Sequence, residues 1–191
     1  MSRIWITSDN HFSHKNIHKF CPKTRPDENW EVMNERMIAR WQEQVSSTDT
    51  VYMLGDVFFC NSAEAIRIME RLPGHKHLVY GNHDNAIRGN STLRGMFESI
   101  NEYREVRVNG TDVIMFHYPI QEWNKMHRGS VNVYGHIHHA VSGVPGRTIN
   151  VCVDSPELFD ENNPYSLFDM SDVLKVALAR EIMPHHGRTI L

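Results

Sequence analysis

The sequence contains little cysteine, and the three residues present, Cys21, Cys60 and Cys152, are irregularly spaced. An odd, unpatterned set argues against a disulfide framework and favours a reducing compartment, so we expect a cytoplasmic protein. No apolar run approaches the roughly 20 residues that a membrane-spanning helix needs, and no signal peptide is recognisable. A net charge of −3 excludes a global attraction to nucleic acid, although it is compatible with a local basic patch.

Linkers, low-complexity runs and internal repeats are also missing. With 191 residues, 40% of them apolar, the chain is long enough to bury a hydrophobic core, and we expect a single domain over residues 1–191. Histidine, by contrast, is abundant at 13 residues. A bound metal would therefore have nitrogen and oxygen ligands rather than sulfur.

Five short β-rich runs are present, at residues 3–7, 50–54, 77–80, 113–116 and 131–134. Apolar runs of this length next to glycine or polar residues predict buried strands. Between them, helical spacing of apolar residues runs from Trp30 to Val45, and a second helix should open at Asn61-Ser62. This order predicts an α/β domain whose first half has largely parallel strands.

The second half of the chain shows a different pattern. Asn109-Gly110 between two β-rich runs is a strong hairpin signal, so we expect antiparallel strands there. Two helix starts are also suggested: Pro26-Asp27 is a candidate N-cap ahead of Trp30, and Ser171 is a candidate N-cap for a last helix that would extend to Ile182.

Each of the five predicted strands ends at a side chain that could bind metal. In open α/β sheets, ligands collect outside the carboxyl ends of the strands. The residues at that position are Asp9, His11, Asp56, Asn82, His117, His136 and His138. Each one alone is more often a turn residue or a helix cap, but their coincidence favours a metal site.

The number and type of these side chains indicate the kind of site. Seven exceed the roughly three or four ligands of one zinc ion, and they suffice for two metals that share a carboxylate. Mixed ligation by His, Asp and Asn suits manganese, iron, zinc or nickel, and it is too rich in nitrogen for a magnesium or calcium site.

In order along the chain, the motifs resemble those of the calcineurin-like metallophosphoesterases: Asp9-Asn10-His11, Gly55-Asp56, Gly81-Asn82-His83-Asp84, His117 and Gly135-His136-Ile137-His138. The resemblance extends from Arg3 to about Asp154. Stretches such as SDNHFSHKNI and HYPIQEW are similar to the small single-domain bacterial and phage members. The resemblance implies two mixed β-sheets packed as a sandwich and flanked by helices.

The resemblance also implies a role for each residue. Asp9, His11 and His138 would bind the first metal, and Asn82, His117 and His136 the second, with Asp56 bridging them. His83 would act as the catalytic residue that approaches the substrate phosphate. Many members have an Asp or Asn three residues after the bridging Asp, where this chain has Phe59, which puts the support of His83 in question.

We therefore expect a dinuclear metal-dependent phosphoesterase, with manganese favoured, in which a water or hydroxide between the ions attacks phosphorus. Little sequence lies outside the core to form a lid, which favours an open cleft and a small or nucleotide phosphodiester substrate. A phosphomonoesterase or protein phosphatase, a nuclease on single-stranded nucleic acid, and a non-catalytic scaffold remain as alternatives. No membrane partner is expected.

Several other residues permit two interpretations. His14 and Asn16 could contact the substrate or begin a helix, and Arg128 could bind a phosphate oxygen or form a surface ion pair. We expect Trp123 to be a packing residue and Cys152 to be a small buried apolar residue rather than a nucleophile.

Overall fold

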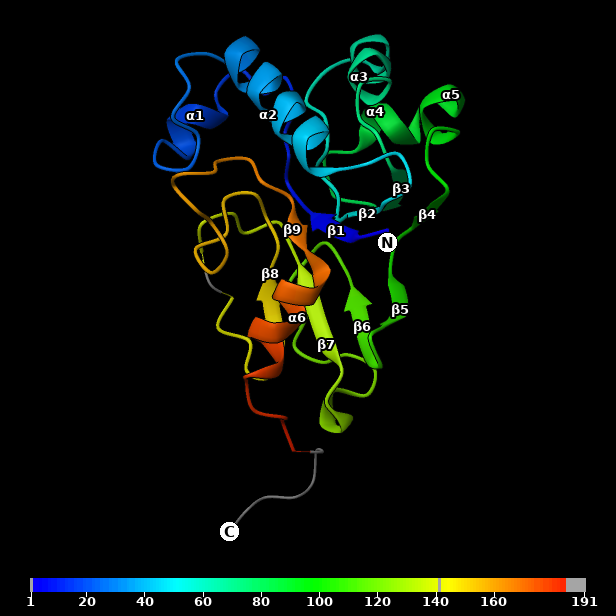
Figure 1. Cartoon of the computed structure of the whole chain (residues 1–191), viewed down its shortest axis with the longest axis vertical. Coiled ribbons are helices and arrows are strands. Elements are labelled where there is room, and N and C mark those ends of the chain that lie inside the picture. Colours follow the sequence, from blue (N-terminus) through cyan, green and yellow to red (C-terminus); the bar gives the residue numbers. More distant parts are fainter. Residues whose placement is uncertain (1, 141, 185–191) are drawn as a thin grey trace.

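The structure is a computed structural model that describes residues 2–140 and 142–184. Two mixed β-sheets pack against each other and helices flank them (Figure 1). This arrangement confirms the fold class that the sequence predicted.

The first sheet has five strands in the order β4-β3-β2-β1-β9. They are β1 (Ile4–Thr7), β2 (Thr50–Met53), β3 (His75–Val79), β4 (Ser99–Asn101) and β9 (Phe168–Asp169). β1 to β4 are parallel, as predicted, and β9 pairs with β1 in the antiparallel direction. The sequence did not predict β4 and β9, because three and two residues are too few to show a periodicity.

The second sheet has four strands in the order β5-β6-β7-β8. They are β5 (Arg104–Val108), β6 (Thr111–Met115), β7 (Val131–Tyr134) and β8 (Thr148–Asn150). The predicted hairpin is confirmed: β5 and β6 are antiparallel, and Asn109 and Gly110 between them have φ values of 48° and 80°. β7 pairs in the parallel direction with both neighbours, so the antiparallel expectation holds only for the hairpin in this sheet.

Five helices belong to the outer side of the first sheet: α1 (Ile17–Phe20), α2 (Trp30–Gln44), α3 (Ser62–Met69), α4 (Asn85–Arg88) and α5 (Ser91–Arg94). α6 (Met170–Leu178) contacts strands of both sheets, and a short 3-10 helix, η1 (Met126–Arg128), precedes β7. Within the described part of the chain, no helix combines the length and the apolar character needed to cross a membrane.

Side chains alternate along β1, and this alternation creates two apolar cores. Trp5 packs in the core beneath α2, together with Trp41, while the next residue, Ile6, packs between the sheets with Val113 and Val133. A shift of one residue in register would exchange these two faces, so burial on both sides fixes the position of β1. The fixed position of β1 therefore also fixes where the next residues, Ser8 to His11, begin.

The structure corrects two helix starts and one helix end. The N-cap of α2 is Asn29, whose side chain accepts a hydrogen bond from the backbone N–H of Val32, whereas Asp27 accepts one from the hydroxyl of Tyr165. In α6 the cap is Asp169, one residue before the helix, and its side chain accepts the backbone N–H of Ser171. This helix ends at Leu178 rather than Ile182, and Arg180 beyond it bonds to Thr148 and Glu157.

Candidate metal centre

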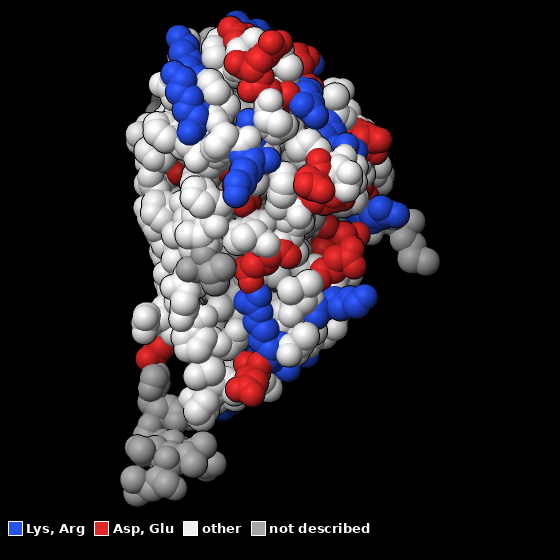
Figure 2. All heavy atoms as spheres, turned by 90° about the vertical axis from the view of Figure 1, so that its left-hand side faces the viewer, with Lys and Arg blue, Asp and Glu red and all other residues white. Residues whose placement is uncertain are grey.

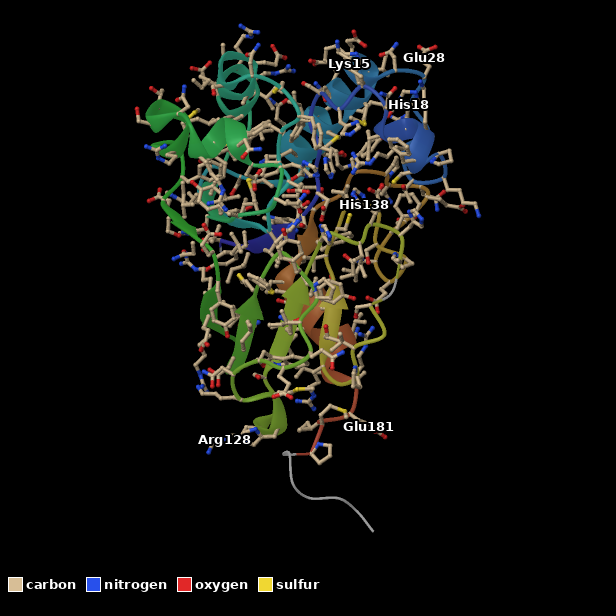
Figure 3. The ribbon with its side chains drawn as sticks, turned by 180° about the vertical axis from the view of Figure 1, so that it is seen from behind. Lys15, His18, Glu28, Arg128, His138 and Glu181 are labelled. Atoms are coloured by element: carbon tan, nitrogen blue, oxygen red, sulfur yellow. The ribbon has the colours of Figure 1, made fainter. Side chains whose placement is uncertain are left out.

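The seven candidate ligands follow β1, β2, β3, β6 and β7, and the fold brings these strand ends together. In Figure 3 His138 lies in the middle of the molecule, where the two sheets meet. The parallel pairing of β1, β2 and β3 places their carboxyl ends on one edge of the first sheet. The parallel pairing of β6 and β7 does the same in the second sheet.

The first group of side chains consists of Asp9, His11 and His138, whose ligand atoms all lie within 4.8 Å of one another. Oδ1 of Asp9 is 3.8 Å from Nε2 of His11 and 3.9 Å from Nε2 of His138. These separations are too long for hydrogen bonds. The three atoms thus face a common point without bonding to one another.

The second group consists of Asp56, His117 and His136, again within 4.8 Å. Oδ2 of Asp56 is 3.6 Å from Nε2 of His117. It is also 3.9 Å from Nε2 of His11, in the first group, so this carboxylate lies between the two groups. Oδ1 of Asn82 is 3.1 Å from Nε2 of His117 and therefore belongs to the second group.

Unpartnered polar atoms test whether these residues fit a metal ion. Among the described residues, Oδ1 of Asp9 and Nε2 of His11 are buried and have no hydrogen-bond partner. A buried polar atom without a partner costs about 1–3 kcal/mol, which coordination of a cation would offset. The orphaned atoms are an oxygen and a nitrogen that face one another, which is the donor set that transition metals prefer. The residues therefore fit a metal.

The backbone at the site is strained. Five of the seven candidate ligands have a positive φ: Asp9 (56°), His11 (52°), Asp56 (53°), His136 (70°) and His138 (46°). For residues other than glycine this conformation is uncommon and costs about 1–3 kcal/mol each. Strain of this kind persists where the surrounding structure holds the backbone in place. The strained turns direct these side chains towards the two groups of candidate ligands.

Glycines in the motifs permit the close approach of neighbouring turns. A Cβ at Gly81 would overlap the backbone and carboxylate of Asp56, and a Cβ at Gly135 would overlap the side chains of Ser8 and Asp9. Asp84 then locks the turns together, because its carboxylate accepts the backbone N–H groups of Asp56, Val57 and Gly81 at 2.7–3.0 Å. Asp84 is thus a structural residue that holds three backbone N–H groups.

A backbone carbonyl on the side away from the site orients the ring of His117. Its Nδ1 is 2.6 Å from the backbone carbonyl of Leu54, so this nitrogen carries the proton and Nε2 is free to face the site. Burial lowers the pKa of His117, but the carboxylates of Asp56 and Asp9 outweigh it, and the net direction is upward.

His138 is oriented by a buried carboxylate that the sequence did not single out. Oδ2 of Asp154 is 2.8 Å from Nδ1 of His138 and 2.8 Å from Nη2 of Arg25. Arg25 also donates to the backbone carbonyls of Asp9 and Asn10. Although burial raises the pKa of Asp154, Arg25 and His138 lower it overall. Asp154 follows the apolar run 149–153, so the strand-end pattern that found the other residues could have found it too.

A third cluster of Cys21, His138 and Asp154 also lies within 4.8 Å. It does not resemble an empty cation site, because the carboxylate of Asp154 is already paired with the guanidinium of Arg25. Cys152 is fully buried as predicted, and burial raises the pKa of its thiol, which keeps it protonated.

His83 lies beside the site without joining either group. Its backbone N–H donates to Oδ1 of Asp56 at 2.8 Å, and its side chain is 47% exposed, with Nε2 4.0 Å from Oδ2 of Asp56. The ring centroid of His83 is 6.0 Å from that of His11. The partly exposed ring of His83 therefore lies beside both groups of candidate ligands.

The centre opens into a recess of about 330 Å³. Histidines and apolar residues line it, among them His11, His83, His138, Phe59 and Phe20. Of the described residues that line the recess, none is Lys, Arg, Asp or Glu. His14 belongs to this lining, whereas Asn16 begins a helix as the N-cap residue of α1, and its backbone N–H donates to Nδ1 of His14.

Two other residues lie away from the centre. Arg128 is at the lower end of the molecule in Figure 3, far from His138 in the middle, so it is not a phosphate ligand of this site. Trp123 is buried and donates its indole N–H to the carbonyl of Ser130, as expected of a packing residue. His77 is half-buried, and its Nδ1 lies 2.8 Å from Oγ of Ser99.

Comparison with known proteins identifies relatives over most of the chain. Residues 3–171 match the calcineurin-like phosphoesterase superfamily domain. An uncharacterized protein of Methanocaldococcus jannaschii is 33% identical over 142 residues, which cover 73% of this chain and 71% of that protein. The gene 66 protein of Mycobacterium phage L5 is 25% identical over 185 residues, covering 81% and 88% of the two chains.

Among solved structures, a protein of unknown function from Aquifex aeolicus superposes with a TM-score of 0.68. It is 25% identical and the match covers 92% of this chain and 100% of that one.

Proposed function

This chain belongs to the calcineurin-like phosphoesterase superfamily, and from that premise we propose that it is a dinuclear metal-dependent phosphodiesterase acting on a small or nucleotide substrate. The observation that carries the proposal is the position of Asp56 between two groups of convergent ligands. We further propose that residues 1–191 form one catalytic domain that works in the cytoplasm.

In this proposal, Asp9, His11 and His138 hold the first ion, Asn82, His117 and His136 hold the second, and Asp56 is shared. When bound, the two ions lower the pKa of a water and withdraw charge from the phosphate oxygens. The donor set favours manganese, with iron, zinc or nickel as alternatives. The chain's own part is to hold the ligands rigidly, through the strained turns and through Leu54, Asp84 and Asp154 behind them.

His83 is the proposed catalytic residue. Its half-exposed ring faces the same opening as His11 and lies close to the bridging carboxylate of Asp56. An imidazole at this position can donate a proton to the leaving oxygen as a general acid.

A diester fits the recess better than a monoester. A phosphomonoester carries close to two negative charges and a diester carries one, and the described lining of the recess supplies no Lys or Arg. A nuclease acting on a polymer would need a continuous basic groove. On the face that carries α1, Figure 2 shows positive and negative side chains interspersed.

The proposal is tested by measuring how much metal the protein binds and how fast it hydrolyses two phosphate esters. Manganese-reconstituted protein should hold two ions per chain and should hydrolyse bis-p-nitrophenyl phosphate faster than p-nitrophenyl phosphate. Asp56→Asn should abolish turnover and lose both ions, whereas His136→Ala should keep more metal because it weakens only one site. A wild-type stoichiometry of one ion or fewer, or equal metal loss in the two variants, would contradict the dinuclear assignment.

A further inference from the structure

The recess beside the metal centre extends from His11 and His138 to the first residues of α1. Its volume of about 330 Å³ is at the low end of ligand sites, which span about 300–1,000 Å³. A recess of this size takes one small group next to the phosphate rather than a polymer.

The side chain of Phe59 forms one wall of this recess. The backbone is extended here, because the N–H of Phe59 donates to the carbonyl of Phe12 at 2.8 Å and Phe12 pairs with Phe58. Consecutive side chains therefore point to opposite sides: Phe58 is buried in the core at 2% exposure, and Phe59 is 37% exposed.

The ring of Phe59 lies against the rings of three histidines beside the metal centre. Its centroid lies 4.1 Å from that of His14, 4.7 Å from His83 and 4.9 Å from His11. On the far side of His14 lies Phe20, whose ring centroid is 6.4 Å from that of His14. Phe20 is 65% exposed. Two exposed aromatic rings next to a polar centre leave apolar area in water, which a flat apolar ligand would cover.

Charge narrows the kind of ligand further. The described residues lining the recess include no Lys or Arg to pair with a second phosphate and no Asp or Glu to pair with an ammonium group. A neutral planar ring fits this lining, and stacking on aromatic side chains is the common way in which proteins hold a nucleobase without reading its sequence.

We infer that Phe59 is the surface on which the base of a nucleotide substrate stacks, with the phosphate of that nucleotide at the metal centre. The placement of the phosphate rests on the proposed function. This role makes Phe59 a specificity residue.

The experiment compares two probes that differ only by the base, adenosine 5′-monophosphate and ribose 5-phosphate. Their binding to the manganese-loaded protein is measured by calorimetry. Base stacking is worth about 1–3 kcal/mol, so the wild type should bind the adenosine compound about 5- to 150-fold more tightly.

Two variants of the same residue separate a ring effect from a structural one. Phe59→Leu should lose most of the preference for the base while binding ribose 5-phosphate as the wild type does. Phe59→Tyr keeps the ring and should keep the preference. Equal binding of both probes by the wild type, or equal weakening of both in Phe59→Leu, would overturn the inference and leave the proposed function standing. Failure of both probes to bind would overturn the phosphate site as well.

Discussion

The ring of His138 has a carboxylate on each side. Nε2 is 3.9 Å from Asp9, and Nδ1 is 2.8 Å from Asp154, whose other contacts include the buried guanidinium of Arg25. Burial lowers the pKa of His138, but the hydrogen bond to Asp154, the contact with Cys21 and the charge of Asp9 together outweigh it and raise the pKa to about 10. The bond to Asp154 fixes the ring so that Nε2 faces the centre, and a metal at that nitrogen would displace a proton.

We predict that Asp154→Asn weakens manganese binding at the first site by about 10–100-fold, because the ring of His138 loses its orienting carboxylate. The variant should also unfold more easily, since Arg25 keeps a buried charge without its partner. Titration calorimetry and thermal unfolding measure the two effects. The second site serves as the control and should keep its affinity. If both sites weaken equally, Asp154 supports the fold in general and does not position His138.

For His83→Ala we predict a loss of about 10²–10⁴ in turnover with both metals retained, which is the usual contribution of a general acid. The loss should be smaller for a nitrophenolate leaving group, which needs little protonation, and larger for a ribose hydroxyl. Steady-state rates on both kinds of diester, with metal content measured alongside, provide the comparison. The same factor on both leaving groups would replace the acid role with charge stabilisation, and no loss would make His83 a turn residue only.

At the scale of the elements, one buried carboxylate joins the first two strands of the sheet. Asp49 precedes β2, and its Oδ1 accepts the backbone N–H of Arg3 at 2.8 Å. Its Oδ2 accepts the indole N–H of Trp5 and the backbone N–H of Ser46. Burial raises the pKa of Asp49, but these three donors lower it overall to about 2.

We predict that Asp49→Ala destabilises the protein by about 1–3 kcal/mol at pH 7, because buried donors lose their acceptor. The pKa of Asp49 is about 2 when folded, against 3.8 as the ordinary value. Its ionised form therefore stabilises the fold above about pH 4, and this contribution disappears as the pH falls towards 2. Urea unfolding at pH 7 and pH 3 should show a smaller difference between variant and wild type at pH 3. Glu28→Ala, a change at an outlying acid labelled in Figure 3, is the control and should change little at either pH.

For the whole molecule, the main question is how strongly the metal centre and the fold depend on each other. The apolar cores bury both faces of the first sheet, so the fold does not depend on metal alone. The strained turns and the unpartnered atoms of Asp9 and His11 nevertheless lie where both sheets meet. Metal binding should therefore stabilise the whole domain without being required for folding.

We predict that chelation lowers the melting temperature without unfolding the protein at room temperature. A ligand at about 100 times its dissociation constant adds about 2.7 kcal/mol, which corresponds to about 5–10 °C for a chain of this size. Thermal unfolding with and without a chelator, followed by return of manganese, measures the shift. Unfolding of the metal-free protein at 25 °C would show that the cores are insufficient, and an unchanged melting temperature would argue against a pre-built site.

By itself, the sequence determined the main strands, the hairpin at Asn109-Gly110 and the residues that follow each strand. These features depend on side-chain periodicity and turn chemistry, which are local properties. The short strands β4 and β9 were decided by the tertiary structure, because pairing with longer neighbours stabilises segments that have no signal of their own. The contact of Asp154 with His138 and Arg25 is of the same kind, since it joins residues 129 positions apart. Likewise, the sequence alone does not place Arg128 or Phe59, and only the packing of the sheets put Arg128 far from the centre and turned Phe59 towards it.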